Sequence, residues 1–185
     1  MIDDLIQDAV RRMDKSVETT QHEFNSIRTG RAAAALLDHI TVDYYGTATP
    51  LNQLSTINVP EPRMLTIQPF DPSSLKTIEK AIMESDLGLT PSNDGKIIRL
   101  PIPQLTEERR KDLVKVVRQR AEDGRIAVRN VRRDVMHHLK ELVQKGDVGN
   151  DEERRAEELA QKLTDDHVHK IDELLKRKEA EILEV

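Results

Sequence analysis

The chain has 185 residues, a net charge of -5 at pH 7, 34% charged residues and 2% aromatic residues. This length permits one medium domain or two small ones, and a composition so rich in charge and so poor in aromatic rings favours long solvent-facing helices over a large enzyme core. Cysteine is absent, which excludes disulfides, thiolate metal sites and cysteine nucleophiles, and no stretch approaches 18 apolar residues, so we expect a soluble, cytoplasmic protein without membrane contact.

An amphipathic helix is predicted over residues 2–28. Its apolar side chains recur at steps of three, four and seven, which places them on one face: Ile2, Ile6, Ala9, Met13, Val17, Phe24 and Ile27. We expect the helix to stop at Gly30, because glycine readily takes the left-handed conformation that ends helices. Such a helix is about 40 Å long and needs partners from elsewhere in the chain.

The hydrophobic period changes after residue 36. Short runs of β-branched or aromatic residues, separated by glycine and proline, predict strands at 38–46, 55–60, 63–70 and 96–100. Between the last two, Asp71 as N-cap and Pro72 at the first position predict a helix that continues to Gly88, followed by a turn at 91–95. Residues 31–104 are therefore expected to form a small β/α/β domain.

Two further long helices are predicted in the C-terminal half. The first begins after Thr106 as N-cap and has an apolar stripe in steps of three and four: Leu113, Val117, Ala121, Gly124, Val128, Val131, Val135, Leu139 and Leu142. It is about 60 Å long, although Gly124 weakens it by roughly 1 kcal/mol relative to alanine. The second begins at Asn150 or Asp151, and its apolar face is formed by Leu159, Leu163, Ile171, Leu174, Leu175 and Ile182.

The three long helices are expected to pack on one another, because the first has no partner next to it in sequence. The predicted fold class is α+β, with a discontinuous three-helix bundle made of residues 1–30 and 105–185 and the β/α/β domain inserted between them. Two connecting segments would join the domains and act as a hinge. The expected hinge residues are Gly30, Arg31, Pro101, Pro103 and Gln104.

Positive charge is concentrated in one segment of this acidic chain. Residues 109–133 contain ten Lys or Arg and three acidic residues, a local charge of +7 that leaves -12 for the rest. Within this segment Arg125, Arg129, Arg132 and Arg133 fall in an arc of about 100°, displaced by roughly 120° from the apolar stripe. No acidic residue lies between the first and last of them, and the guanidinium fork suits phosphate oxygens. We interpret the four as contacts to a nucleic-acid backbone.

Other interpretations of these features remain open. The basic face could be solvated and neutralised by nearby acids, or the long helices could clasp an acidic protein partner, and a metal-dependent hydrolase is a more distant alternative. The pairs His137–His138 and His167–His169 diverge on a helix and are expected on the surface, without metal. Gly95–Lys96 lacks the rest of a phosphate-binding loop, and no nucleophile has a nearby base. We therefore expect no catalytic residues, no cofactor and no enzyme activity.

Five stretches of the chain carry a family resemblance. SIRTGRA, DYYGTATPLNQL, ESDLGLTPSNDGKIIRLPIP, LTEERRKDLVKVV and RIAVRNVRRD occur in this order, and the chain closely resembles the bacterial ribosome recycling factors over its whole length. The resemblance implies two domains in an L shape, a three-helix bundle and a β/α/β domain. It also implies that the protein binds the ribosome after termination and, together with elongation factor G, splits it into subunits, releasing messenger RNA and transfer RNA.

The resemblance also implies roles for individual arginines. In this family the bundle lies on the large ribosomal subunit and its arginine-bearing helix contacts ribosomal RNA, which points first to Arg132, then to Arg129, with Arg125 and Arg133 beside them. Secondary candidates near the junction of the domains are Arg28, Arg31 and Arg110, for which capping of helix ends is an equal alternative. The implied partners are large-subunit RNA and elongation factor G, and we expect a monomer.

One stretch departs from the family pattern. Where the family has a polar residue and then proline after TGRA, this chain continues with Ala33, Ala34 and Ala35. Alanine can prolong a helix where proline would forbid it. The family resemblance is therefore the weakest guide to how stiff the connection between the two domains is at this stretch.

Overall fold

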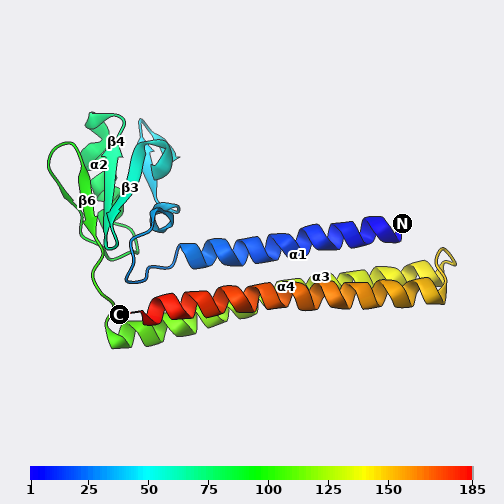
Figure 1. The fold of residues 1–185 in the computed structure, drawn as a ribbon. Helices are drawn as coiled ribbons and strands as arrows, with labels where there is room; N and C mark the ends of the chain where they lie inside the picture. Colours follow the sequence, from blue (N-terminus) through cyan, green and yellow to red (C-terminus); the bar gives the residue numbers. More distant parts are fainter. Residues whose placement is uncertain (185) are drawn as a thin grey trace. The chain divides into compact units, whose positions relative to one another are not determined.

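The computed structural model describes residues 1–184, which form two compact units (Figure 1). Unit 1 comprises Met1–Phe24 and Lys111–Ala180, and unit 2 comprises Asn25–Arg110 and the segment from Glu181 onward. The chain therefore passes between the units at three places. The part of the chain that the structure describes contains no helix with both the length and the apolar character that a bilayer crossing requires.

Unit 1 is formed by three long helices, which run side by side in Figure 1: α1 (Ile2–Asn25), α3 (Glu107–Gln144) and α4 (Asn150–Leu183). The predicted start of α3 is confirmed, since the Thr106 hydroxyl accepts a hydrogen bond from the backbone N–H of Arg109 at 3.1 Å. The predicted end of α1 is wrong. This helix ends at Asn25, because the following chain turns away and Thr29 is buried with its hydroxyl donating to Glu181 at 2.9 Å.

The core of unit 1 contains the stripe predicted on α3 but only part of the apolar face predicted on α4. Every predicted position of the α3 stripe is buried except Leu142, which is half-buried. On α4, the predicted positions Ile171 and Ile182 are buried, whereas Leu159 is 43% exposed, and the rest of the buried face consists of small or polar residues: Ala156, Ala160, Thr164, His167 and Lys178. The hydropathy pattern misses this face because the Thr164 hydroxyl bonds the Ala160 carbonyl at 2.7 Å, which makes a polar residue acceptable in the core.

His167 is buried rather than exposed on the surface. Its side chain is 4% exposed, with Nδ1 2.6 Å from the Leu163 carbonyl oxygen and Nε2 2.7 Å from the Asp14 carboxylate. Both ring nitrogens of this buried imidazole therefore have an oxygen atom as hydrogen-bonding partner. His167 thus joins α4 to α1 through its side-chain contact with Asp14. Within residues 1–184 no three His, Asp or Glu side chains are grouped as metal ligands.

Gly124 marks the closest approach of α3 to its neighbours. A Cβ atom at this position would clash with Oγ1 of Thr20 on α1 and would lie 3.1 Å from Cδ1 of Ile171 on α4. Thr20 is itself buried, and its hydroxyl donates to the Ser16 carbonyl at 2.9 Å. The glycine that weakens α3 as an isolated helix is therefore what lets the three helices pack.

Unit 2 contains two antiparallel sheets and one α-helix. Strands β1 (Thr41–Tyr44) and β2 (Thr47–Pro50) form a hairpin. The second sheet has the order β3-β4-β6-β5, with strands β3 (Ser55–Glu61), β4 (Met64–Pro69), β5 (Ser92–Asn93) and β6 (Ile98–Pro101). Helix α2 (Leu75–Met83) contributes Leu75, Ile78 and Ile82 to a core shared with Leu65, Ile67, Ile98 and Leu100 of the sheet.

Three sequence predictions in unit 2 need correction. The single strand predicted at 38–46 contains only β1 and a turn, because Tyr45 and Gly46 both have positive φ, as a two-residue hairpin requires, and β2 follows. The predicted turn at 91–95 contains the short strand β5. Asp71 does cap, accepting from the Ser73 N–H at 3.0 Å, but it caps a 3₁₀ turn, and the α-helix that follows ends at Met83 rather than at Gly88.

The alanine run does not prolong the first helix. Ala33 is extended, with φ -147° and ψ 138°, and Ala34–Leu37 form a short 3₁₀ helix that buries Leu36 and Leu37 in the core of unit 2. The backbone N–H of Ala32 donates to the Pro62 carbonyl at 2.7 Å. These contacts hold the segment in unit 2, so helix propensity alone does not decide its conformation.

The turn before β6 predicts a dependence of stability on pH. The Asp94 carboxylate accepts hydrogen bonds from the backbone N–H groups of Ile97 and Lys96 and from the Arg99 guanidinium, which lower its pKa from 3.8 to about 2. Because the pKa is lower in the folded state, ionised Asp94 stabilises the fold above about pH 4 and loses this effect as the pH falls toward 2.

Replacing Asp94 with asparagine is therefore expected to reduce the stability of unit 2 at pH 7. The difference from the unchanged protein should shrink between about pH 4 and pH 2, where the native carboxylate is itself protonated. Chemical denaturation at several pH values, together with a carboxyl NMR titration of Asp94, measures this. A titration midpoint near 4 contradicts the assignment.

Candidate nucleic-acid interface

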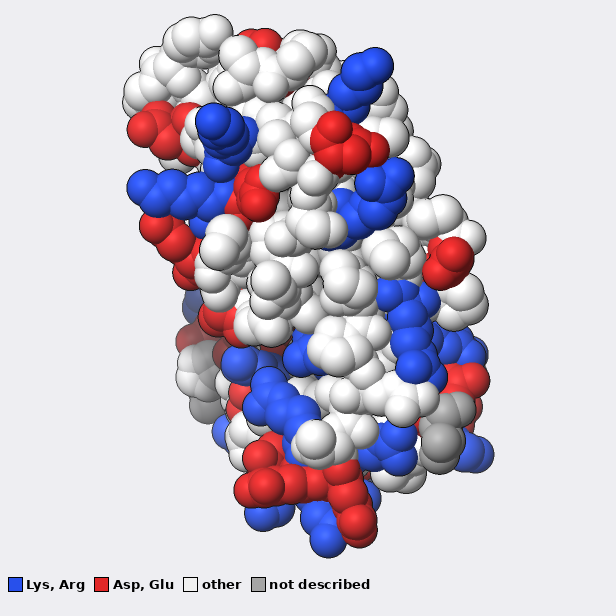
Figure 2. All heavy atoms as spheres, turned by 90° about the vertical axis from the view of Figure 1, so that its left-hand side faces the viewer, with Lys and Arg blue, Asp and Glu red and all other residues white. Residues whose placement is uncertain are grey.

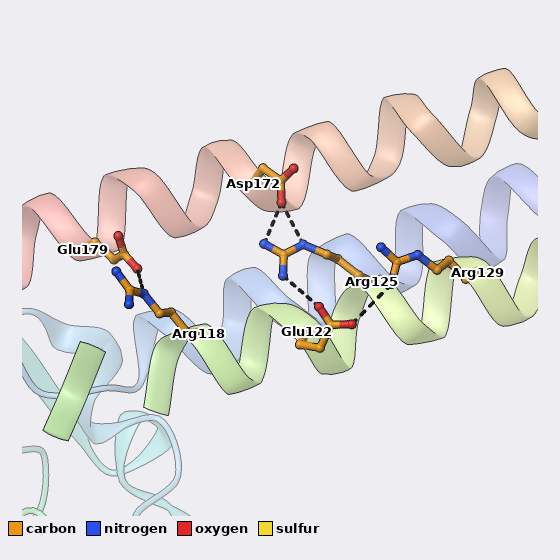
Figure 3. Close-up of polar contacts among 6 residues, drawn as sticks. All are labelled: Arg118, Glu122, Arg125, Arg129, Asp172 and Glu179. Atoms are coloured by element: carbon orange, nitrogen blue, oxygen red, sulfur yellow. Dashed lines mark hydrogen bonds and ion pairs between the residues drawn. The ribbon is translucent and has the colours of Figure 1, made fainter. Parts of the chain in front are cut away.

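The flank of α3 that faces α4 carries arginines at a spacing of seven residues. Arg118 Nε lies 2.6 Å from the Glu179 carboxylate, and Arg125 Nε and Nη2 lie 2.8 and 2.7 Å from Oδ1 of Asp172 (Figure 3). Seven residues is two turns of a helix, so both the arginines of α3 and their acids on α4 recur on one side of each helix. These two ion pairs fasten α3 to α4.

Arg125 is neutralised twice within unit 1. Its side chain is 19% exposed, and Nη1 also donates to Oε2 of Glu122 at 3.0 Å. Burial lowers the pKa of Arg125, but the hydrogen bonds that it donates to Asp172 and Glu122, with the charges of these carboxylates, outweigh burial and raise it. Arg125 therefore has carboxylate partners, although no acidic residue lies between Arg125 and Arg133 in the sequence. Its two partner carboxylates come from Glu122, one turn earlier on α3, and from Asp172 on α4.

Arg129 shares the same carboxylate. Its Nη1 donates to Oε1 of Glu122 at 3.2 Å, and its side chain is 42% exposed (Figure 3). Glu122 thus bridges two arginines with its two oxygens. Arg129 keeps more contact with solvent than Arg125 does, so its guanidinium remains accessible, but a phosphate would have to compete with Glu122 for it.

Arg132 and Arg133 retain their full positive charge. Neither has a carboxylate partner within residues 1–184: Arg132 Nη1 donates to the amide oxygen of Gln161 at 2.9 Å, and Arg133 Nη1 lies 3.4 Å from the amide oxygen of Asn130. The Nε atom of Arg132 is buried and has no hydrogen-bond partner. Of the four predicted arginines, these two therefore carry the uncompensated charge.

The charged side chains on one face of the molecule are mixed in sign. On the face drawn in Figure 2, Lys and Arg side chains stand beside Asp and Glu side chains, and neither sign covers an uninterrupted field. Interspersed charges of opposite sign screen one another, so the attraction for phosphate depends on which guanidinium groups lack a carboxylate.

The three secondary arginines lie in unit 2, where Arg28 and Arg31 have hydrogen-bond partners. Arg31 pairs with the Glu184 carboxylate at 2.6 Å, and this hydrogen bond raises its pKa. Arg28 donates to the Pro103 carbonyl at 3.3 Å, and burial followed by the charge of Arg109 lowers its pKa. The Nε atoms of Arg28 and Arg110 are buried without a partner. Arg31 has the clearest structural role of the three.

The residues expected to form the hinge lie inside unit 2. Pro101 is the last residue of β6 and pairs with Met64, and the next residue donates its backbone N–H to the Arg63 carbonyl at 2.8 Å. Gln104 places its amide within hydrogen-bonding distance of the Arg63 guanidinium. Gly30, Arg31 and Pro103 also belong to this unit, whereas the chain changes units after Phe24, Arg110 and Ala180.

Comparison with known proteins relates this chain to one family. The model for ribosome recycling factors matches residues 20–183. The ribosome-recycling factor of Rubrobacter xylanophilus is 58% identical over 180 residues, 97% of each chain, and that of Geobacillus kaustophilus is 55% identical over 185 residues, 100% of each. The solution structure of a ribosome recycling factor has a TM-score of 0.79 at 42% identity and covers 100% of this chain and 98% of its own.

A second solved structure is similar over 100% of both chains, with 49% identity and a TM-score of 0.70. It presents the T. thermophilus ribosome recycling factor and the E. coli elongation factor G bound to the E. coli post-termination complex.

The chain belongs to the ribosome recycling factor family.

In this member of the family, the sequence indicates the candidate arginines but not all the residues that pair with them. Glu122 and Asp172 neutralise Arg125, and Gln161 holds Arg132 without neutralising it. Glu122 could have been found from its spacing of three and seven residues to the two arginines. Asp172 and Gln161 have no such sequence signal, because only the packing of α4 on α3 brings them close to Arg125 and Arg132.

Removing the charge of Glu122 is expected to strengthen binding to large-subunit RNA. The Glu122→Gln variant releases Arg129, while Arg125 keeps Asp172, so we expect a gain in affinity of about two- to fivefold, the value of one partly exposed ion pair. Filter binding or co-sedimentation at low salt measures it.

Glu179→Gln is the matched control for this prediction. It removes the same unit charge from the pair with Arg118 and leaves Arg129 bound to Glu122. An equal gain in RNA affinity in both variants would mean that the affinity depends only on the net charge of the chain.

Proposed function

We propose that this chain binds the post-termination ribosome through large-subunit RNA and, with elongation factor G, splits the ribosome into subunits and releases messenger RNA and transfer RNA. The observation that carries the proposal is the pair of uncompensated guanidinium groups, Arg132 and Arg133, on the helical unit of a ribosome recycling factor family member. The partners are carried over from the 49% identical protein that is bound, with elongation factor G, to a post-termination complex.

Phosphate recognition explains why an acidic protein can bind RNA. Guanidinium groups without a carboxylate of their own can form paired hydrogen bonds to phosphate oxygens and release counterions, so binding is favourable in spite of a net charge of -5. The three helices of unit 1 hold these groups on a backbone fixed by the pairs of Arg118, Arg125 and His167. Because this backbone is already fixed, less conformational entropy is lost when the two guanidinium groups bind RNA.

We assign a mechanical role to the chain rather than a catalytic one. Elongation factor G would supply the energy of GTP hydrolysis, and unit 2 would transmit force through the chain segments that join it to unit 1. The turn at Gly95–Lys96 supports the assignment of GTP hydrolysis to elongation factor G alone. Its backbone N–H groups, which could otherwise bind phosphate, are already bonded to the side-chain oxygens of Asn93 and Asp94. The protein would act in the cytoplasm as a monomer.

Co-sedimentation with purified large subunits across a salt series tests the proposal. Binding should occur at low salt, and the logarithm of the binding constant should fall linearly with the logarithm of the salt concentration, as expected when phosphates are neutralised. A subunit-splitting assay with elongation factor G and GTP then tests the activity. Absence of binding at low salt refutes the proposal, and binding that does not change with salt favours the competing idea of a protein clasp.

A further inference from the structure

The third arginine of the row facing α4 differs from the other two in its partner. Arg118, Arg125 and Arg132 follow one another at seven-residue spacing on α3, and all three contact α4. The first two meet the carboxylates of Glu179 and Asp172. Arg132 meets a neutral amide, that of Gln161. At this one place in the row, α4 anchors the arginine and leaves its charge in place.

The orientation of the Gln161 amide is determined by a second contact. Its Nε2 donates to Oδ1 of Asp165 at 2.9 Å, one helical turn further along α4, and its Oε1 accepts from Arg132 Nη1 at 2.9 Å. A reversed amide would turn its N–H groups toward the guanidinium and its oxygen toward the carboxylate, which would cost both hydrogen bonds. Asp165 therefore selects the orientation in which Gln161 accepts from Arg132, although it does not contact the arginine itself.

The remaining nitrogens of Arg132 show what this arrangement leaves available. Nε is buried without a partner, and Nη1 is held by Gln161. Nη2 has no hydrogen-bond partner within residues 1–184 and is not among the buried unpaired atoms, so it keeps contact with solvent. A carboxylate in place of the amide would satisfy the guanidinium better, as at Arg125, but it would also cancel the charge.

We infer that Gln161, oriented by Asp165, is the positioning residue that presents Arg132 to ribosomal RNA with its charge intact. This inference rests on the proposed function of Arg132 as a phosphate contact. The long arginine side chain is held at one end by Gln161 and by the packing around its buried Nε, so less conformational entropy is lost when Nη2 reaches a phosphate. The Gln161 amide holds Arg132. The Asp165 carboxylate bonds the amide instead of the guanidinium, so it does not neutralise the charge of Arg132.

Substitution of Gln161 by glutamate separates positioning from folding. The new carboxylate would pair with Arg132, so we expect the affinity for large subunits to fall about tenfold, the loss of one charge-assisted contact, while the thermal midpoint stays near that of the unchanged protein. Gln161→Met, which removes the anchor but leaves the charge, should give a smaller loss, about threefold. Asp172→Asn is the matched control at Arg125: it should lower the thermal midpoint and leave the affinity of the folded protein unchanged.

The outcomes distinguish this inference from the proposed function. If Arg132→Ala binds large subunits as well as the unchanged protein does, the role of Arg132 itself is rejected. If Arg132→Ala is impaired but Gln161→Glu binds normally, the positioning role is overturned and the proposed function stands. If Gln161→Glu loses thermal stability and affinity together, as a structural residue would, the positioning role is likewise overturned. A salt series on Gln161→Glu should also give a shallower slope than the unchanged protein, which loss of folded protein alone does not produce.

Discussion

Replacing Arg132 with alanine is expected to weaken binding to the large subunit by about 10- to 100-fold, the range for loss of one hydrogen-bonded contact between charged groups. The slope of log affinity against log salt should fall by about one, because one fewer phosphate is neutralised. Subunit splitting with elongation factor G should fall in parallel when the factor is not saturating. Co-sedimentation across a salt series and a light-scattering assay of splitting measure these effects.

The fold should tolerate this substitution. Among the described residues, Arg132 bonds only a neutral amide and its buried Nε has no partner, so alanine removes an unsatisfied group as well as a hydrogen bond. Alanine also favours the helical conformation, which glycine would not. Helical circular dichroism should therefore stay close to that of the unchanged protein. Full splitting activity in a correctly folded variant would contradict the assigned role.

Arg125→Ala is the control, in which we expect a loss of stability and little loss of affinity. It leaves Asp172 and Glu122 without their partner, so we expect a loss of about 1–2 kcal/mol in the free energy of unfolding, discounted for the exposure of both acids. The affinity of the folded fraction should change much less than in the Arg132 variant. If Arg125→Ala instead reduces affinity as strongly while remaining folded, Arg125 contacts RNA in spite of its two carboxylates.

A methyl group at position 124 is expected to destabilise unit 1, although it raises helix propensity. Alanine gains roughly 1 kcal/mol over glycine in a helix interior. Against this, the new Cβ would clash with Oγ1 of Thr20 and approach Cδ1 of Ile171 to 3.1 Å, and overpacking of this kind costs about 1–3 kcal/mol. We expect Gly124→Ala to lower the free energy of unfolding by about 1–2 kcal/mol, as measured by urea denaturation.

A double-mutant cycle with Thr20→Ala identifies the obstacle. Without the hydroxyl, the nearest remaining atom of residue 20 is its Cβ, at 3.5 Å from the added methyl group, which is an ordinary contact, and only the 3.1 Å approach to the flexible end of Ile171 remains tight. Gly124→Ala should therefore be clearly less destabilising in the Thr20→Ala background, and neutral if Ile171 adjusts. Equal destabilisation in both backgrounds would show that Thr20 is not the residue that requires glycine.

Helix periodicity predicted the long elements well and their ends poorly. The α3 stripe from Leu113 to Leu139 is buried as expected, because a regular pattern over so many turns leaves one face to pack. The end of α1 depends instead on Thr29 reaching Glu181, a residue more than 150 positions away, and no local signal reports this. The L-shaped arrangement and the hinge role of Gly30 and its neighbours stay predictions.

The buried face of α4 shows why hydropathy alone misplaces a core. Thr164 and His167 are buried because each finds hydrogen-bond acceptors, the Ala160 carbonyl for the first and the Leu163 carbonyl and Asp14 for the second. A polar side chain becomes a core residue when its partners are supplied, and the partner on α1 is supplied only by the packed helices.

The sequence by itself determined the three amphipathic helices, the segment of charge +7 and the membership of a family, because these depend on residue type and local spacing. Only the tertiary structure decided which arginines are neutralised. Arg125 and Arg132 lie seven residues apart on the same side of α3, yet one meets Asp172 and the other Gln161 on α4. Electrostatic energy depends on distance in space, and the distances between helices are set by packing contacts such as that of Gly124 with Thr20, which no local periodicity records.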